Sequence, residues 1–257
     1  MELEHIKLSV ADHVATVALN RPPVNAFNRA LRQEVTRVFD TLHDRDDVRA
    51  IVLTSAGRIF CAGADIKERA AMADAPGEQV ALNRLVREMF YSIMECSKPV
   101  IAAVNGPALG AGFALTLCCD ILVAAESAVF AMPEIDVGIA GGVKFLQRHL
   151  SPSKVRYLML TGERILAPEL YRLGVLERCP PDAAMMGVAM DIARNIASKS
   201  PVAVRMLKDS FNMVDNLSLR DGYRLEQNTT VELSRSEDAQ EAKRAFIEKR
   251  KPVFKGR

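Results

Sequence analysis

The chain has 257 residues, of which 49% are hydrophobic, which is enough for one substantial core or a core with an appendage. Its 34 basic and 32 acidic residues nearly balance, so the formal net charge of +2 gives no support to a role on nucleic acid or at a membrane surface. No apolar run reaches the length of a membrane span. The first ten residues lack the pattern of a signal peptide, and the five cysteines lack metal-ligand spacing. Their apolar neighbours suit buried, reduced thiols, so we expect a cytoplasmic protein.

The first half of the chain alternates predicted strands with predicted helices. Short apolar runs rich in β-branched residues predict strands, and apolar residues at helical spacing predict helices. The predicted strands are residues 6–10, 14–19, 50–54, 99–104, 121–124 and 128–130. The predicted helices are residues 28–42, 80–96 and 113–119. Alternation of this kind is typical of a largely parallel sheet with crossover helices, so the expected fold class is α/β.

The second half of the chain is predicted to be mainly helical. The predicted helices are residues 153–160, 167–173, 183–198, 201–214, 219–233 and 239–249. We place a boundary near residue 200, at the sequence SKSP, because a short polar stretch ending in proline separates two helices there. This divides the chain into a core, residues 1–200, and a helical C-terminal part, residues 201–257.

Two turns rich in small residues are candidates for chemistry. Residues 55–67, SAGRIFCAGADIK, can turn sharply and lay their backbone against a ligand. After the predicted strand 99–104, the sequence NGPALGAG leads into the apolar helix 113–119. The start of such a helix carries unpaired N–H groups and partial positive charge, so it can hold a developing oxyanion. The alternative is that these glycines only permit close packing of helix on strand, and the motif by itself leaves both interpretations open.

Three segments occur in order along the chain: FCAGADIKE at residues 60–68, NGPALGAGFALTLCCD at residues 105–120 and FAMPEIDVG at residues 130–138. Together they resemble the crotonase family of acyl-CoA enzymes, also called the enoyl-CoA hydratase/isomerase family. The tail AFIEKRKPVFKGR, residues 245–257, is similar to the last helix of that family. The resemblance covers nearly the whole chain.

The resemblance implies an α/β fold built as a crotonase-like spiral of strand–strand–helix turns. It also implies that the C-terminal helices assemble the chain into a homotrimer, or into a hexamer of two trimers. The implied partner is an acyl-CoA substrate of fatty acid metabolism. No metal and no further cofactor is expected, because coenzyme A is itself part of the substrate.

The resemblance assigns the catalytic roles by motif position. The backbone N–H groups of Ala64, after Gly63, and of Ala111, after Gly110, are expected to polarise the thioester carbonyl. Glu134, in the PE motif, is expected to act as the acid/base. The physical argument agrees, because a thioester α-carbon becomes acidic enough near neutral pH only if the enolate oxygen is stabilised, and two preorganised donors in a dry pocket do that.

Ala114 stands where hydratases of the family typically carry their first glutamate. One remaining carboxylate favours moving a proton from one carbon to another, which is double-bond isomerisation. Some hydratases that resemble this arrangement, such as the feruloyl-CoA hydratase-lyase type, also lack the first glutamate, so hydration stays open. Two further alternatives are a thioester or C–C hydrolase on the same scaffold and a catalytically silent CoA-binding protein.

The carboxylates in the third motif also have plainer interpretations. A glutamate after proline in a loop is most often a solvated surface residue. Apolar surface from Met132 and Ile135 would instead raise the pKa of Glu134 toward that of a usable base. If the segment is extended, Asp136 lies on the same side as Glu134 and is either a second acid or a solvated or capping residue.

The stretch GIAGGVKFLQR, residues 138–148, departs from the IPGAGGTQR more frequent in the family. There Lys144 and Phe145 replace small residues near the expected acyl pocket, and Lys144 either reshapes that pocket or points to solvent. By resemblance, we expect the adenine to contact the residues after Ala64, the pantetheine arm to follow residues 24–26, and the basic tail to meet the 3′-phosphate and adenine. The implied substrate contacts are Val24, Ala26, Ala62, Asp65, Ile66, Lys67, Gly110, Ala114, Gly142, Lys251 and Phe254.

Overall fold

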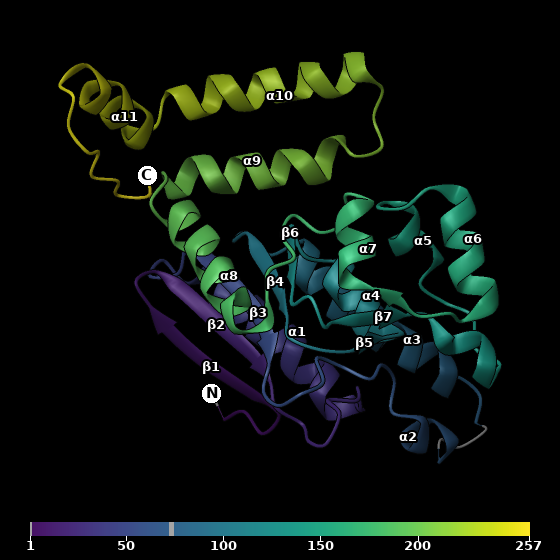
Figure 1. The fold of residues 1–257 in the computed structure, drawn as a ribbon. Coiled ribbons are helices and arrows are strands. Elements are labelled where there is room, and N and C mark those ends of the chain that lie inside the picture. The colour runs from purple at the N-terminus through teal and green to yellow at the C-terminus, as the bar shows by residue number, and fades with distance from the viewer. Residues whose placement is uncertain (1, 72–74) are drawn as a thin grey trace.

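A five-stranded sheet forms the centre of the molecule in the computed structural model, which describes residues 2–71 and 75–257 (Figure 1). The strand order is β1-β2-β3-β4-β6. Strand β1 is antiparallel to β2 at one edge, and all other neighbours are parallel. The strands are β1 Ile6–Ala11, β2 Val14–Leu19, β3 Ala50–Ser55, β4 Val100–Val104 and β6 Ile121–Ala124. The predicted α/β class, the edge hairpin and the parallel sheet are confirmed.

The central strands are apolar on both faces because helices cover both faces. Every residue of β3 and β4 is buried. Since successive strand residues point to opposite sides, Val52 and Ile101 pack with the helix α8, Asp182–Ala197, while Ile51 and Leu53 belong to the main core on the other side. Figure 1 shows α8 lying across the sheet.

A second, smaller sheet has the order β5-β7-β8. Its strands are β5 Ala108–Leu109, β7 Val129–Ala131 and β8 Ile165–Leu166. The sequence predicts β7 but not β5 or β8, because two residues are too few to show alternation. β5 is followed by the helix α4, Ala111–Leu117, and β7 is followed by the 3₁₀ helix η1, Pro133–Val137. Pairing of β5 with β7 therefore brings the start of α4 beside η1, and the candidate site lies where they meet.

The longer helices of the core begin and end within a few residues of their predicted bounds. Side-chain caps explain several starts; for example, Asn28 accepts a hydrogen bond from the N–H of Leu31 at 2.9 Å. The short helices α2 and α5 and the 3₁₀ helix η1 were not predicted, because fewer than two turns give no clear period. The core helices are α1 Arg29–Asp44, α2 Ile66–Ala70, α3 Glu78–Met94, α4 Ala111–Leu117, η1 Pro133–Val137, α5 Val143–Gln147, α6 Pro152–Thr161, α7 Ala167–Arg172 and α8.

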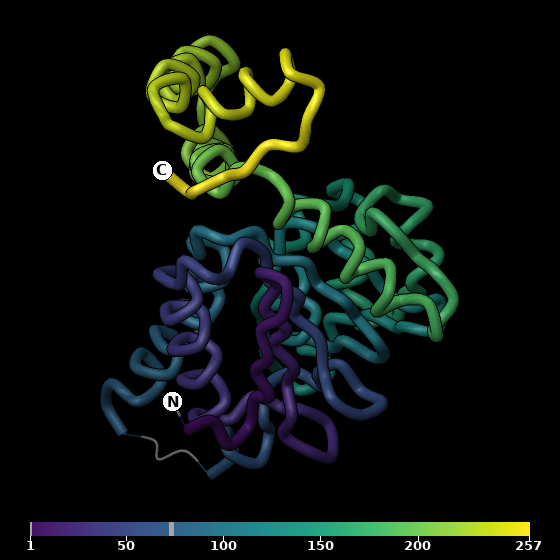
Figure 2. Tube along the Cα trace, turned by 90° about the vertical axis from the view of Figure 1, so that its left-hand side faces the viewer, coloured from purple at the N-terminus to yellow at the C-terminus, as the bar shows by residue number. Residues whose placement is uncertain are grey.

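Three helices form the C-terminal part: α9 Pro201–Val214, α10 Leu219–Ser234 and α11 Glu237–Ile247. Helices α9 and α10 lie side by side in opposite directions above the core, with α9 the nearer of the two (Figures 1 and 2). The last residues return to the start of α9, where buried Asp238 accepts hydrogen bonds from Ser200 Oγ at 2.9 Å and from the Lys255 N–H at 2.7 Å. The predicted boundary near residue 200 falls between α8 and α9, and the division into two domains stays a prediction.

A buried ion pair joins α9 to the core. The Lys208 side chain is 3% exposed, and its Nζ donates to Asp120 Oδ2 at 2.8 Å and to the Lys98 carbonyl at 2.9 Å. The same Asp120 oxygen accepts the N–H of Val100 at 2.7 Å, at the first residue of β4. The ammonium therefore links the projecting helix to the central sheet.

We expect Lys208→Met to lower the free energy of unfolding by about 2 kcal/mol, because the buried ammonium is the group that donates to the Asp120 carboxylate and to the Lys98 carbonyl, and methionine replaces neither hydrogen bond. Urea unfolding followed by circular dichroism measures this change. Lys199→Met, at an exposed lysine on the same side of the molecule, serves as the control and is expected to change stability by less than about 0.5 kcal/mol. Equal effects of the two substitutions would contradict the role given to Lys208.

Candidate active site

A cavity of about 460 Å³ lies where the start of α4 meets α2, α3, η1 and α5. This volume lies in the usual range for small-molecule sites. One wall is apolar and is closed by the rings of Phe90 and Phe145, whose centroids are 5.0 Å apart. The apolar side chains of that wall are Leu82, Val86, Met89, Phe90 and Phe145.

Two backbone turns approach each other at the floor of the cavity. The first turn is residues 61–64, and the second is residues 108–112. The Leu109 N–H donates to the Cys61 carbonyl at 2.9 Å. A Cβ on Gly63 would lie 2.8 Å from the Leu109 carbonyl oxygen and 3.4 Å from the Ala111 nitrogen, and a Cβ on Gly112 would lie 2.5 Å from the Cys61 carbonyl oxygen. Glycine is therefore needed at both positions for this close approach.

The amides of Ala64 and Ala111 differ from their neighbours because neither has an acceptor within residues 2–71 and 75–257. On either side of Ala64, the N–H of Gly63 faces the Cys61 sulfur at 3.4 Å and the N–H of Asp65 donates to a backbone carbonyl at 3.0 Å. Ala111 is the first residue of α4, where helical N–H groups have no partner inside the helix. Both alanines line the cavity.

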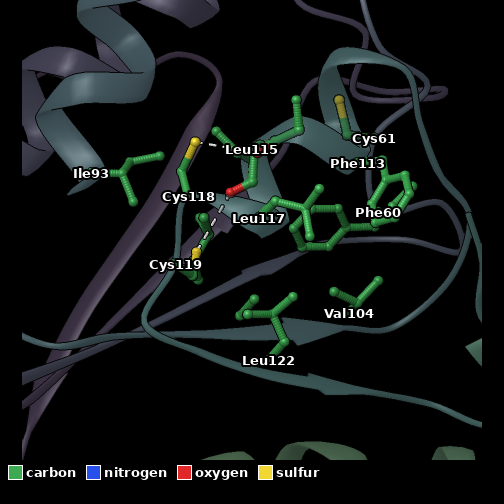
Figure 3. Close-up of a cluster of buried hydrophobic side chains, with 14 of the residues drawn as sticks. Phe60, Cys61, Ile93, Val104, Phe113, Leu115, Leu117, Cys118, Cys119 and Leu122 are labelled. Atoms are coloured by element: carbon green, nitrogen blue, oxygen red, sulfur yellow. Dashed lines mark hydrogen bonds between the residues drawn. The ribbon is translucent and has the colours of Figure 1, made fainter. Parts of the chain in front are cut away.

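The helix behind these amides is anchored in the main core. Figure 3 shows Phe113 and Leu117 of α4 close to Phe60, which precedes the first turn. The ring of Phe113 also lies 5.0 Å from that of Phe130 in β7. Cys61, in the first turn, is fully buried, and this burial raises the pKa of its thiol to about 12, so the thiol stays protonated and inert.

Glu134 stands in η1 rather than in an irregular loop, and its carboxylate packs directly against the second turn. A Cβ on Gly110 would overlap Glu134 Oε1, and the residue after Gly110 is Ala111. Glu134 Oε2 is fully buried and has no hydrogen-bond partner among the described residues. Burial of this carboxylate raises its pKa. The expected direction of the shift is confirmed.

Met132 and Ile135 were both expected to surround Glu134 with apolar surface, and the structure agrees for Met132 but not for Ile135. Met132 is 1% exposed and lines the cavity, but Ile135 is 48% exposed and faces the end of α6 instead. The premise that residues 134–136 are extended is wrong, because this segment forms a 3₁₀ helix. Asp136 nevertheless lines the same cavity, with its carboxylate close to Gly162 at the end of α6. A second acid role for Asp136 stays a prediction.

Of the two residues that depart from the family pattern within residues 138–148, Phe145 reaches the cavity and Lys144 does not, and a change in the shape of the pocket stays a prediction. Phe145 lines the wall, whereas Lys144 is exposed and does not line the cavity. Gly142, at the start of α5, has a φ of +81°, and a Cβ there would overlap the Met132 methyl group. The glycine thus lets α5 pack close to the wall beside Glu134.

The structure brings together many of the residues that the resemblance implied. Those that line the cavity are Ala62, Ala64, Ile66, Gly110, Ala111, Ala114, Glu134 and Gly142. The others implied for substrate contact do not line it; they are Val24, Ala26, Asp65, Lys67, Lys251 and Phe254.

These six residues lie in three places. Val24 and Ala26 lie behind the first turn, where the Ala62 N–H donates to the Val24 carbonyl at 3.0 Å. Asp65 caps α2 and binds Arg21 at 2.8 Å, and Lys67 points outward from that helix. The remaining two belong to the tail beyond α11, which Figure 1 places beside the start of α9. Their contacts with substrate stay predictions.

Sequence analysis missed two arginines that line the cavity. Arg32 of α1 is 4% exposed and donates to Glu68 Oε2 at 2.9 Å. Its position next to Leu31, on the apolar face of a predicted helix, is the signal that could have revealed it. Arg69 follows Ile66 by three residues in α2, and nothing in the sequence fixes the direction of so short a helix.

Within residues 2–71 and 75–257, no group of three or more His, Cys, Asp or Glu side chains could hold a metal ion. None of the helices formed by these residues combines the length and the apolar composition needed to cross a bilayer.

The fold and the paired turns place the protein among the crotonase-fold proteins. The enoyl-CoA hydratase/isomerase family model matches residues 9–257. The chain is 36% identical over 262 residues to a carnitinyl-CoA dehydratase of Proteus mirabilis, with 99% of each chain covered. It is 35% identical over 256 residues to a short-chain-enoyl-CoA hydratase of Clostridium acetobutylicum, covering 98% of this chain and 97% of the other.

The structural comparison agrees. The crystal structure of an enoyl-CoA hydratase from Bacillus anthracis superposes with a TM-score of 0.93 at 35% identity, covering 99% of this chain and 100% of the other. The chain belongs to the enoyl-CoA hydratase/isomerase family. The predicted family and crotonase-like fold are therefore confirmed.

We expect Gly110→Ala to lower kcat/KM on an acyl-CoA substrate about 100-fold, because the new methyl group would displace the Glu134 carboxylate from its place beside Ala111. Gly110 has a φ of +53°, so some backbone strain is added as well. Gly174→Ala is the matched control: its φ is +77°, and a Cβ there would meet no described atom within 4 Å. If both variants lose activity equally, strain rather than displacement is the cause.

Proposed function

We propose that this chain binds an acyl-CoA thioester with the carbonyl oxygen between the amides of Ala64 and Ala111, and that Glu134 transfers a proton at the adjacent carbon. The observation that carries the proposal is the conjunction of two amides without acceptors and one buried carboxylate oxygen, Glu134 Oε2, without a partner among the described residues. All three groups line one cavity. Buried polar groups are normally satisfied, so unsatisfied groups gathered in one place indicate a site prepared for a ligand.

The amides supply the larger part of the expected stabilisation. When a proton leaves the α-carbon, negative charge develops on the thioester oxygen as the enolate forms. Two preorganised N–H donors oppose that charge in a largely apolar cavity, and each is worth on the order of 3 kcal/mol in the transition state. Because Ala111 begins a helix, the partial positive charge of the helix start adds to the effect.

Double-bond isomerisation is the reaction that the carboxylates of the site support best. The Glu134 carboxylate removes a proton from the α-carbon of a 3-enoyl-CoA, and the electron pair moves onto the thioester oxygen. The resulting carboxylic acid returns the proton at the γ-carbon, the double bond shifts to the 2-position, and Glu134 is regenerated. Ala114, 3% exposed and in the cavity, supplies no second acid for holding water.

Hydration of a 2-enoyl-CoA, or the reverse dehydration, is the second candidate. Two observations favour it: the similar proteins named above are a hydratase and a dehydratase, and Asp136 lines the same cavity as Glu134. In this reaction Glu134 takes a proton from water as the oxygen adds to the β-carbon. The same proton then passes to the α-carbon, and the enolate collapses to the thioester.

Incubation with 3-enoyl-CoA and 2-enoyl-CoA separately, followed by mass spectrometry and chromatography of the products, tests the proposal. We expect turnover of at least one substrate and a loss of about 1000-fold in kcat for Glu134→Gln, since the amide cannot accept the proton. Glu126→Gln, at an exposed glutamate outside the cavity, is the control. Release of free CoA instead would support a thioester hydrolase, and tight binding without proton exchange at the α-carbon would support a silent CoA-binding protein.

The pH dependence follows from the raised pKa of Glu134. Because the base must be ionised, kcat/KM is expected to rise with pH with a midpoint above the ordinary glutamate value of 4.5. The free energy of unfolding is expected to fall as pH rises. The folded state stabilises the protonated form of Glu134, and this contribution is lost as pH rises through the raised folded-state pKa. Glu134→Gln should therefore melt at a higher temperature than the wild type at pH 7, with the gap closing toward pH 4. A wild type that is the more stable at pH 7 would contradict this.

The assembly that we propose is a homotrimer, or a hexamer formed from two trimers, in the cytoplasm. Its support in the structure is the apolar surface that the C-terminal helices expose. Large apolar side chains that are more than half exposed there include Leu207, Phe211, Leu219, Phe246 and Ile247. Exposed apolar surface of this kind marks interaction sites more often than free surface.

A further inference from the structure

The helix α2 turns one arginine into the cavity. Ile66 and Arg69 are three residues apart, so they share a helix face, and both line the cavity. Between them, Lys67 points outward, and Glu68 is occupied with Arg32 of α1. Of the three charged residues of α2, Arg69 is the one that lines the cavity.

Arg69 differs from Arg32 in having no partner among residues 2–71 and 75–257. Arg32 donates to Glu68 at 2.9 Å, which neutralises its charge. Arg69 is partly buried and forms no hydrogen bond or ion pair with the residues that the structure describes. A partly desolvated guanidinium with no partner has five unused N–H donors in a planar fork that matches a carboxylate.

The acidic groups of the cavity lie on other walls. Glu134 packs against Gly110 at the start of α4, and Asp136 lies beside Gly162 at the end of α6. The residues that α3 contributes to the same cavity are apolar, as Leu82 and Val86 are, or neutral, as Asn83 is. An acyl chain that follows this apolar wall would thus end near a cation whose charge is not used.

We propose that the acyl group of the substrate carries a distal carboxylate and that Arg69 binds it, so that Arg69 determines specificity. The inference rests on the proposed function, since it takes the apolar wall to hold the acyl chain. A guanidinium–carboxylate pair is charge-assisted and usually bidentate. An acyl chain that ends in a quaternary ammonium group, such as the carnitinyl group, would be repelled from the same place.

A CoA phosphate offers Arg69 the same chemistry as a carboxylate, so the experiment separates the two sources. Pentanoyl-CoA and glutaryl-CoA have five-carbon saturated acyl chains that end in a methyl group and a carboxylate respectively, and both carry every phosphate of CoA. Neither has a double bond to isomerise or hydrate, so their binding can be measured by titration calorimetry without turnover.

We expect the wild type to bind glutaryl-CoA about tenfold more tightly than pentanoyl-CoA, because a hydrogen bond to a charged group contributes at least that factor. Arg69→Met should abolish the difference while leaving the affinity for pentanoyl-CoA within about twofold. Arg84→Met is the matched control, since Arg84 is an exposed arginine of α3 that does not line the cavity, and it should keep the wild-type preference.

The other outcomes overturn the inference or separate it from the proposed function. If Arg69→Met weakens both ligands by the same factor, Arg69 binds the CoA phosphates and the proposal is wrong. A wild type that prefers pentanoyl-CoA, or that binds neither ligand, overturns it as well. If the preference and its loss in Arg69→Met are observed but no enoyl-CoA is turned over, the inference stands and the proposed reaction fails.

Discussion

The close approach of two backbone turns is the constraint on which the site depends. The first turn, residues 61–64, lies against the second, residues 108–112, so tightly that a methyl group on Gly63 or Gly112 would run into a carbonyl oxygen of the other turn. This contact places two amide groups in one cavity and leaves both without acceptors. An N–H group that lacks an acceptor and is shielded from water costs on the order of 1 to 3 kcal/mol, so for two such amides the fold must offset at most about twice that amount elsewhere.

The offset comes from the core beneath the turns. β5 is only two residues long, but it pairs with β7 and so holds the second turn against the segment that leads to Glu134. On the other side, α4 buries every residue after its first, including the large ring of Phe113. A fully buried phenylalanine contributes about 1.5 to 3 kcal/mol, so the apolar face of this one helix is enough to balance the two amides.

Long periodic elements could be predicted from the sequence because their own residues determine them. β4 is uniformly apolar, and α9 begins at Pro201 and ends at Val214, both as predicted. The two turns could be located because glycines next to small residues interrupt the apolar runs, but the motif by itself left close packing and oxyanion binding both open. The Glu134 role could be stated only through the family resemblance, since its burial depends on Gly110, which lies in another segment.

Two features could not be predicted from the sequence. One is which side of a short helix faces the cavity, and the other is which side chains from distant segments form the cavity wall together. The five residues of α2 show no period, so the side of the helix that carries Arg69 emerges only from its packing. The sequence predicts a loop for residues 133–137, because five residues that begin with a proline show no helical period, whereas the segment forms a 3₁₀ helix that contacts α6. The ring pair of Phe90 and Phe145 joins residues 55 positions apart in the chain.

The electrostatics of the cavity depend on keeping its charges apart. Burial is the main cause of the raised pKa of Glu134, and no ion pair joins Glu134 to Arg69 in the described structure. Were the guanidinium to reach that carboxylate, the ion pair would favour the charged form and lower the pKa, so the base would bind protons too weakly to return one to carbon. Holding Arg69 on α2 and Glu134 on η1 avoids this. A ligand carboxylate at Arg69 would neutralise the cation and so leave the environment of Glu134 governed by desolvation, which is the condition that proton transfer at this site requires.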